Sequence, residues 1–220
     1  SVLKQIEQEV TPLFGQGRVA QYIPALANID PKQFAMGITL TSGEFFGVGN
    51  VDTPFSIQSI SKVFSYTLAL RAHKDELFKR VWREPSGNPF NSLVQLEYEE
   101  GKPRNPFINA GAIVVCDSLV SLKPDEGKAL RYITDFIQQC SNDFTITTDP
   151  VVASSEMVHG YRNSALANLM KSFGNLENDV DLVLKTYFAQ CSIEMSAKQL
   201  SRAMLFLAND GTDPISGTQF

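Results

Sequence analysis

The sequence predicts an α+β fold, in which a short β-hairpin precedes a chain that is helical over most of its length. Two β-rich runs, 34–41 and 44–49, are joined by Ser42-Gly43, which is typical of a hairpin. From residue 109 onward, apolar residues recur at helical spacing. Because a two-stranded hairpin is marginal on its own, helices or further strands must cover its apolar side, which we expect to comprise Met36, Ile38, Leu40 and Phe45.

Helical periodicity places the remaining elements in order along the chain. Residues 74–107 carry four prolines and predict loops. Ser196 has the chemistry of an N-cap. The expected helices are 2–14, 58–73, 109–121, 126–139, 162–173, 178–189 and 196–209.

Composition narrows the classes of function. The 220 residues are 43% hydrophobic and 20% charged, with a net charge of −5, as in a soluble globular protein. The basic residues are scattered, which argues against nucleic acid, and no apolar run is long enough for a membrane span. Three cysteines in apolar patterns predict reduced, buried thiols and a cytoplasmic protein. With only His73 and His159, and no CxxC or HxxxH motif, we expect no metal and no cofactor.

A Ser-x-x-Lys motif, formed by Ser59 and Lys62, is the first candidate for catalysis. Residues three apart share one helical face, so a lysine there can take the proton of a serine hydroxyl if its pKa is lowered. Spacing alone is weak evidence, since chance gives about one such pair in this composition and the chain also has Ser1 and Lys4. An ordinary helix surface is the alternative. The apolar neighbours of Lys62 favour burial, and a buried lysine needs a purpose or a partner.

Four polar residues downstream are further candidates, each with an unremarkable alternative. Asn109 opens a predicted helix and could be an N-cap, although the small residues at 110–112 leave room for a close approach and favour a site. Glu156 and Asn163 could bind an α-amino and an α-carboxylate group, or simply lie in a surface loop. Tyr187 could complete a Ser–Lys–Tyr hydrogen-bonded set or pack in the core.

Together these segments resemble the bacterial glutaminases, which hydrolyse L-glutamine to L-glutamate and ammonia. The blocks SIQSISK and NPFINAGA are specific, and they occur in order with the spacing of Glu156 and Asn163. The matching stretches are GQGRVAQYIPALA (15–27), FSIQSISKVF (55–64), EPSGNPFNSLVQLE (84–97), PRNPFINAGAIVVCD (103–117), SEMVHGYRN (155–163), MKSFGN (170–175), YFAQCSIEMS (187–196) and FLANDG (206–211).

The resemblance implies a β-lactamase/transpeptidase-like fold, with a mixed sheet beside a helical subdomain. It implies a single domain over 1–220, incomplete at the carboxyl end, with 15–62 in the sheet subdomain and 63–220 mostly helical. It also implies a homo-oligomer, a dimer or tetramer. Ser59 is then the nucleophile that forms a γ-glutamyl ester and Lys62 its base, with Tyr187 catalytic, and the substrate-contacting positions are Tyr22, Gln58, Ser59, Asn109, Glu156, Asn163 and Tyr187.

The family pattern continues beyond residue 220, with a second active-site tyrosine, a Lys-Ser-Gly strand and a glycine-rich segment. We therefore expect the 220-residue chain to be nearly inactive alone. The residues are also compatible with two other functions. A penicillin-interactive enzyme would share the Ser59/Lys62 pair, but the polar set downstream suits a small amino acid better. A non-enzymatic interaction module would need an exposed apolar hairpin face.

Overall fold

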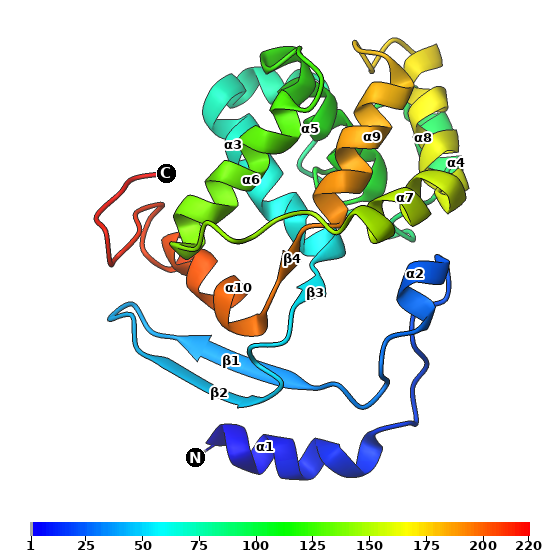
Figure 1. The fold of residues 1–220 in the computed structure, drawn as a ribbon. Helices are drawn as coiled ribbons and strands as arrows, with labels where there is room; N and C mark the ends of the chain where they lie inside the picture. The colour runs from blue at the N-terminus through cyan, green and yellow to red at the C-terminus, as the bar shows by residue number, and fades with distance from the viewer. Residues whose placement is uncertain (1) are drawn as a thin grey trace. The chain divides into compact units, whose positions relative to one another are not determined.

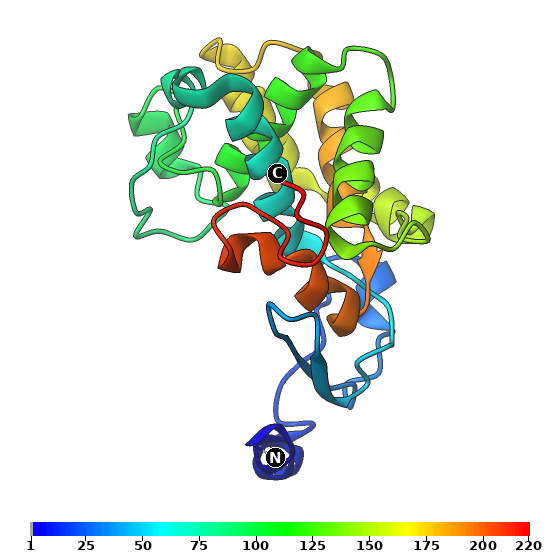
Figure 2. The same ribbon diagram turned by 90° about the vertical axis from the view of Figure 1, so that its left-hand side faces the viewer.

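The computed structural model describes residues 2–220, which form two compact units (Figures 1 and 2). Of the described residues, the sheet unit comprises 2–56, 135–147 and 194–220, and the helical unit comprises 57–134 and 148–193. The predicted subdomain boundary at residue 62 stays a prediction. Across residues 2–220, every helix is too short or too polar to span a lipid bilayer.

The predicted hairpin forms the centre of the sheet unit. Strands β1 (Ala35–Thr39) and β2 (Phe45–Gly49) pair antiparallel. Helix α10 (Ala197–Ala203) contacts β1, and α1 (Val2–Val10) contacts β2. The two helices lie on opposite sides of the hairpin in both views (Figures 1 and 2). One helix therefore lies against each face, but the cover is partial, because Ile38, Leu40 and Phe46 remain 48%, 42% and 46% exposed.

The prediction of a single apolar side was wrong for Phe45. Phe45 pairs with Thr39, whereas Ile38 pairs with Phe46, and residues directly opposite each other share a face. Phe45 therefore lies on the opposite face from Ile38, where its ring is 5.7 Å from the Lys198 ammonium on α10. Thr39 shares that face, and its hydroxyl is 2.6 Å from that of Ser201 on α10.

Shorter elements complete the sheet unit. Strands β3 (Phe55–Ser56) and β4 (Glu194–Met195) pair antiparallel, and two residues are too few for an alternation signal in the sequence. Ser196 caps α10 with a capping box, as predicted. Edge-to-face contacts join the rings of Phe136, Phe206 and Phe220. The other elements are the 3-10 turns Thr11–Leu13 and Leu205–Ala208 and the helix α2 (Pro24–Ala27).

The helical unit is built around α5 (Asn109–Leu122), which is buried from Ala110 to Val120. Helices α3 (Ser61–His73), α8 (Tyr161–Ser172) and α9 (Val180–Cys191) pack against it (Figure 1). The division between the two units falls inside α6 (Lys128–Ser141). The remaining elements are the 3-10 turns Gln58–Ile60 and Lys74–Lys79 and the helices α4 (Val94–Tyr98), α6 (Lys128–Ser141) and α7 (Pro150–His159).

Helix α7 is absent from the sequence prediction, which allowed a surface loop around Glu156. Asp149 caps this helix by accepting hydrogen bonds from the N–H groups of Val151 and Val152 at 2.7 and 3.2 Å, with Pro150 in the first turn. An N-cap aspartate followed by proline is a recognised start signal. The loop interpretation is therefore wrong: Glu156 lies on a helix and is only 4% exposed.

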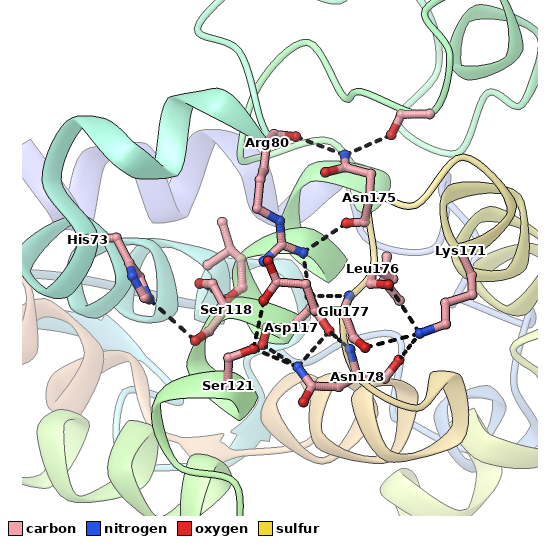
Figure 3. Close-up of polar contacts among 12 residues, drawn as sticks. His73, Arg80, Asp117, Ser118, Ser121, Lys171, Asn175, Leu176, Glu177 and Asn178 are labelled. Carbon is pink, nitrogen blue, oxygen red and sulfur yellow. Dashed lines mark hydrogen bonds and ion pairs between the residues drawn. The ribbon is translucent and has the colours of Figure 1, made fainter.

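A buried carboxylate, Asp117, holds the end of α5 to the segment before α9 (Figure 3). It forms an ion pair with Arg80. Its oxygens also accept hydrogen bonds from the backbone N–H groups of Glu177 and Asn178, each at 3.0 Å. Burial alone would raise the pKa of Asp117, but the Arg80 guanidinium and these N–H donors lower it below the ordinary value of 3.8.

Asp117→Asn is expected to destabilise the helical unit by about 3–5 kcal/mol at pH 7, because it leaves the Arg80 cation without its buried partner. A carboxylate with a lowered pKa stabilises the fold above pH 3.8 and loses that effect as the pH falls through its folded value. The difference in unfolding free energy from the parent chain, measured in urea, should therefore shrink in that acidic range. Glu177→Gln is the control: Glu177 also pairs with Arg80, at 3.4 Å, but is 58% exposed, so its loss should cost under about 1 kcal/mol. Equal costs would contradict this assignment.

Candidate active site

Ser59 lies in a strained turn at the start of α3. Residues Gln58–Ile60 form a 3-10 turn that leads directly into the helix. Gln58 has φ of 46°, in the left-handed region, which costs about 1–3 kcal/mol for such a residue and persists only where the surroundings enforce it. Ser59 is exposed, and no residue of the described chain, 2–220, hydrogen-bonds its hydroxyl. This geometry presents the hydroxyl at a helix amino end, where backbone N–H groups favour developing negative charge.

Lys62 is buried one turn further along α3, with 2% of its surface exposed. Its Nζ donates to the carbonyl oxygen of Phe107 at 2.9 Å and to Oδ1 of Asn109 at 2.8 Å. The ring of Phe90 lies 5.5 Å from the same nitrogen. Within residues 2–220 it forms no ion pair with a carboxylate and no hydrogen bond with Ser59. The helix-surface alternative is therefore excluded, because this lysine lies inside the protein.

The surroundings of Lys62 lower the pKa of its amine. Burial lowers its pKa from 10.5 to about 8, against a smaller raising effect of the Cys191 thiol. Desolvation disfavours the charged form, and within residues 2–220 no carboxylate pairs with Lys62 to offset it. A lysine in this state can act as a base near neutral pH.

Asn109 is not an N-cap. It is the first residue of α5, whose N-cap position is Ile108, and the loop before the helix is instead fixed by Asn105. The Oδ1 of Asn105 accepts from the N–H groups of Phe107 and Ile108, each at 3.0 Å. Asn109 joins two candidate residues, since its Oδ1 accepts from Lys62 and its Nδ2 donates to Oδ1 of Asn163 at 3.0 Å.

The small residues at 110–112 accommodate the chain's own backbone rather than a ligand. A Cβ on Gly111 would lie 1.8 Å from the carbonyl oxygen of Asn105. The close approach expected at these residues is made by the Asn105 backbone. Glycine lets the 105–108 loop lie against α5, and that loop supplies the Phe107 carbonyl to Lys62.

Tyr187 and Glu156 are both buried, at 2% and 4% exposure. The Tyr187 side chain lies near the thiol of Cys191, one turn further along α9, and the two groups affect each other's pKa. Burial raises the pKa of Tyr187 well above its ordinary value, with Cys191 and Glu156 adding to the effect. Burial and the nearby Glu156 likewise raise the pKa of Cys191 to about 12. Within residues 2–220, a Ser–Lys–Tyr hydrogen-bonded set is not formed, because Lys62 Nζ donates to Phe107 and Asn109 and Tyr187 bonds neither Lys62 nor Ser59.

The helical unit thus brings together most of the predicted site residues. Tyr22 belongs to the sheet unit, where it is 61% exposed just before α2, and its part in the site stays a prediction. Among residues 2–220, no three His, Cys, Asp or Glu side chains are grouped so as to hold a metal ion.

Comparison with known proteins decides the family. A family model described as glutaminase matches residues 17–220. The chain belongs to the glutaminase family. A glutaminase of Aliarcobacter butzleri (strain RM4018) is 59% identical over 216 residues, which cover 98% of this chain and 70% of that relative. A glutaminase of Marinomonas sp. (strain MWYL1) is 51% identical over 218 residues, with coverages of 99% and 71%.

Solved glutaminase structures share the fold. Mglu in its tris and glutamate form matches with a TM-score of 0.91 and 30% identity, over 99% of this chain and 48% of the Mglu chain. The predicted α+β, β-lactamase-like fold class is confirmed. The glutaminase chain spans about 70% of its curated relatives and about half of Mglu. Family membership favours glutamine hydrolysis over both alternatives, the penicillin-interactive enzyme and the interaction module.

Sequence reasoning missed one polar residue at this site, Gln190. It is fully buried on α9, and its Nε2 donates to the hydroxyls of Ser61 and Ser65 at 3.3 and 3.0 Å. A glutamine inside an apolar helical pattern is a weak signal, because helical spacing alone does not separate a buried polar residue from a solvated one.

Proposed function

We propose that this chain carries the nucleophile, the base and the amino-acid-binding residues of an enzyme that hydrolyses the side-chain amide of L-glutamine. Ser59 is the nucleophile and Lys62 its base. The observation that supports this most is the pairing of an exposed serine in a strained helix start with a buried lysine, three residues later, whose pKa is lowered to about 8.

The hydrogen bonds of Lys62 suit a neutral amine. A neutral lysine has two N–H donors and one lone pair, whereas an ammonium has three donors. The Phe107 carbonyl and Asn109 Oδ1 accept two N–H groups, which leaves the lone pair for the proton of the Ser59 hydroxyl. The two contacts therefore orient the amine as well as bury it.

In the first half of the proposed reaction, Lys62 takes the proton of the Ser59 hydroxyl as Oγ bonds to the side-chain amide carbon of glutamine. The C–N bond then breaks, and Lys62 returns the proton to the leaving nitrogen, so that ammonia departs. A γ-glutamyl ester on Ser59 remains. In the second half, a water molecule gives a proton to Lys62 and bonds to the ester carbon, and the proton returns to Ser59 as glutamate leaves.

Recognition of the amino-acid head group is proposed for Glu156, Asn109 and Asn163. Glu156 binds the α-ammonium group. Asn163 Nδ2 has no partner within residues 2–220, so both of its N–H groups can donate to the α-carboxylate, and Asn109 keeps one N–H free for the same purpose. A simple amide would leave these groups unpaired, which explains a preference for an α-amino acid.

Tyr22, Gln58 and Tyr187 remain proposed pocket residues, with Tyr187 also proposed as catalytic. The scheme uses no cofactor. We further propose a cytoplasmic homo-oligomer, a dimer or tetramer. The cytoplasmic location is supported by three buried cysteine thiols, which are typical of a reducing compartment, and the assembly rests on the family resemblance alone.

The pH dependence of kcat/KM for glutamine tests the role of Lys62, in a chain extended to the length of its relatives. Because the neutral amine is the active form, kcat/KM should rise about tenfold per pH unit below the pKa of about 8 and level off above it. Asn109→Asp places a carboxylate beside Nζ, which raises the pKa of Lys62 and should move this limb to higher pH. A limb that stays in place, or no limb near pH 8, would contradict the assignment.

A further inference from the structure

Gln190 connects α9 to the turn that carries the nucleophile. Its side chain is fully buried, and its Nε2 donates to the hydroxyl oxygens of Ser61 and Ser65 at 3.3 and 3.0 Å. The Ser61 hydroxyl in turn donates to the carbonyl oxygen of Gln58 at 2.7 Å. A continuous hydrogen-bonded chain therefore runs from Gln190 through Ser61 to the backbone immediately before Ser59.

The end of this chain is the strained residue of the turn. Gln58 has φ of 46°, a conformation that needs support from its surroundings. The Gln58 carbonyl belongs to the peptide unit that leads into Ser59, so fixing this carbonyl fixes the direction in which Ser59 leaves the turn. The Ser61 hydroxyl has one proton, which is given to Gln58, and its oxygen can accept from Gln190 at the same time.

Gln190 carries a polar atom that lowers the stability of the fold. Its Oε1 is buried and has no hydrogen-bond partner within residues 2–220, and an unpaired buried carbonyl oxygen destabilises a fold. A methionine would fill a similar volume without a polar atom that needs a partner. The amide of Gln190 lowers stability, yet it supports a strained turn beside a nucleophile. A role in activity explains why a buried amide stands at this position.

We propose that Gln190 is a positioning residue for the nucleophile. It touches neither the substrate nor the reacting atoms. It acts through Ser61, holding the Gln58 carbonyl so that the Ser59 hydroxyl stays aligned with the substrate amide. This inference rests on the proposed function of Ser59, and it adds a residue from α9 to the support of that site.

Gln190→Met in a full-length chain tests the proposal. We expect kcat to fall by about tenfold or more, because small misplacements of a reacting group slow the reaction strongly. The KM for glutamine should be nearly unchanged. The free energy of unfolding should be equal to or above that of the parent, because the unpaired oxygen is removed. Thr186→Val is the matched control: this buried hydroxyl on α9 donates only to Leu182 within its own helix, at 3.0 Å, and its loss should leave kcat unchanged.

Ser61→Ala provides a second, independent break in the same hydrogen-bonded chain. It should lower kcat in the same direction as Gln190→Met, and the double variant should lose less than the product of the two single losses. Parent-like kcat in both single variants would overturn the positioning role, as would a kcat loss in Gln190→Met that only follows a loss of folded protein. Ser59→Ala separates the two claims: activity in that variant removes the proposed function itself, whereas an inactive Ser59→Ala beside a fully active Gln190→Met removes only the role of Gln190.

Discussion

Ser59→Ala, made in a chain as long as its relatives, is expected to lower kcat for glutamine hydrolysis by about 10⁴-fold or more. The variant lacks the only oxygen that can carry the γ-glutamyl group in the proposed mechanism. Glutamine should still bind, because the head-group contacts proposed for Glu156 and Asn163 are untouched. Ammonia release measures the turnover, and titration calorimetry measures the binding.

The fold of Ser59→Ala should be preserved. The side chain is exposed, so the substitution leaves no buried group unpaired. Ser172→Ala is a suitable control, because Ser172 is also exposed and its hydroxyl bonds only Leu169 within α8, at 2.7 Å. Turnover in Ser59→Ala above about one hundredth of the parent value would be incompatible with covalent catalysis by this residue.

Lys62→Met should abolish turnover to a similar extent, because it removes the base while keeping a side chain of comparable length. It should also change how stability depends on pH. The pKa of Lys62 is about 8 in the folded chain and 10.5 without its surroundings. Between these values the unfolded chain binds more protons, so the parent gains about 1.4 kcal/mol of stability per pH unit relative to Lys62→Met.

Denaturant unfolding of parent and Lys62→Met across this alkaline range measures the slope. Lys185→Met is the activity control, since Lys185 is 63% exposed and pairs with Glu126 on the surface of the helical unit. It should turn over glutamine like the parent. Turnover in Lys62→Met would contradict the role of Lys62 as the base. An unfolding free energy that changes with pH equally in parent and variant would mean that the pKa of Lys62 is not lowered in the folded chain.

The hairpin and most helices could be predicted because their signals are local. Alternation at 34–41 and 44–49 and apolar spacing from residue 109 match β1, β2, α5, α6, α8 and α9 within a few residues. The face of Phe45 was missed because register, which pairs it with Thr39, is fixed between strands and cannot be read from one of them. Helix α7 was overlooked although its start, Asp149-Pro150, carries a recognised signal.

The sequence predicted which residues belong to the candidate site, but not the hydrogen bonds that join them. The Ser-x-x-Lys spacing and the apolar neighbours of Lys62 predict a buried lysine near a serine. The partner of that lysine depends on the 105–108 loop, which Gly111 allows to lie against α5, and such a long-range contact leaves no periodic signal. The left-handed backbone conformation of Gln58 also could not be predicted from the sequence, because glutamine rarely adopts it.

The most direct test is to locate a covalent label from an electrophilic analogue of glutamine, in which a ketone with a leaving group on its adjacent carbon replaces the side-chain amide, so that displacement of that group by Oγ forms a stable ether bond. The full-length chain is inactivated with this analogue, digested and mapped by mass spectrometry. One label per chain is expected, on the Oγ of Ser59, and no labelling is expected in Ser59→Ala. Complete inactivation with the label on another residue, or unchanged labelling of Ser59→Ala, would contradict the role of Ser59 as the nucleophile.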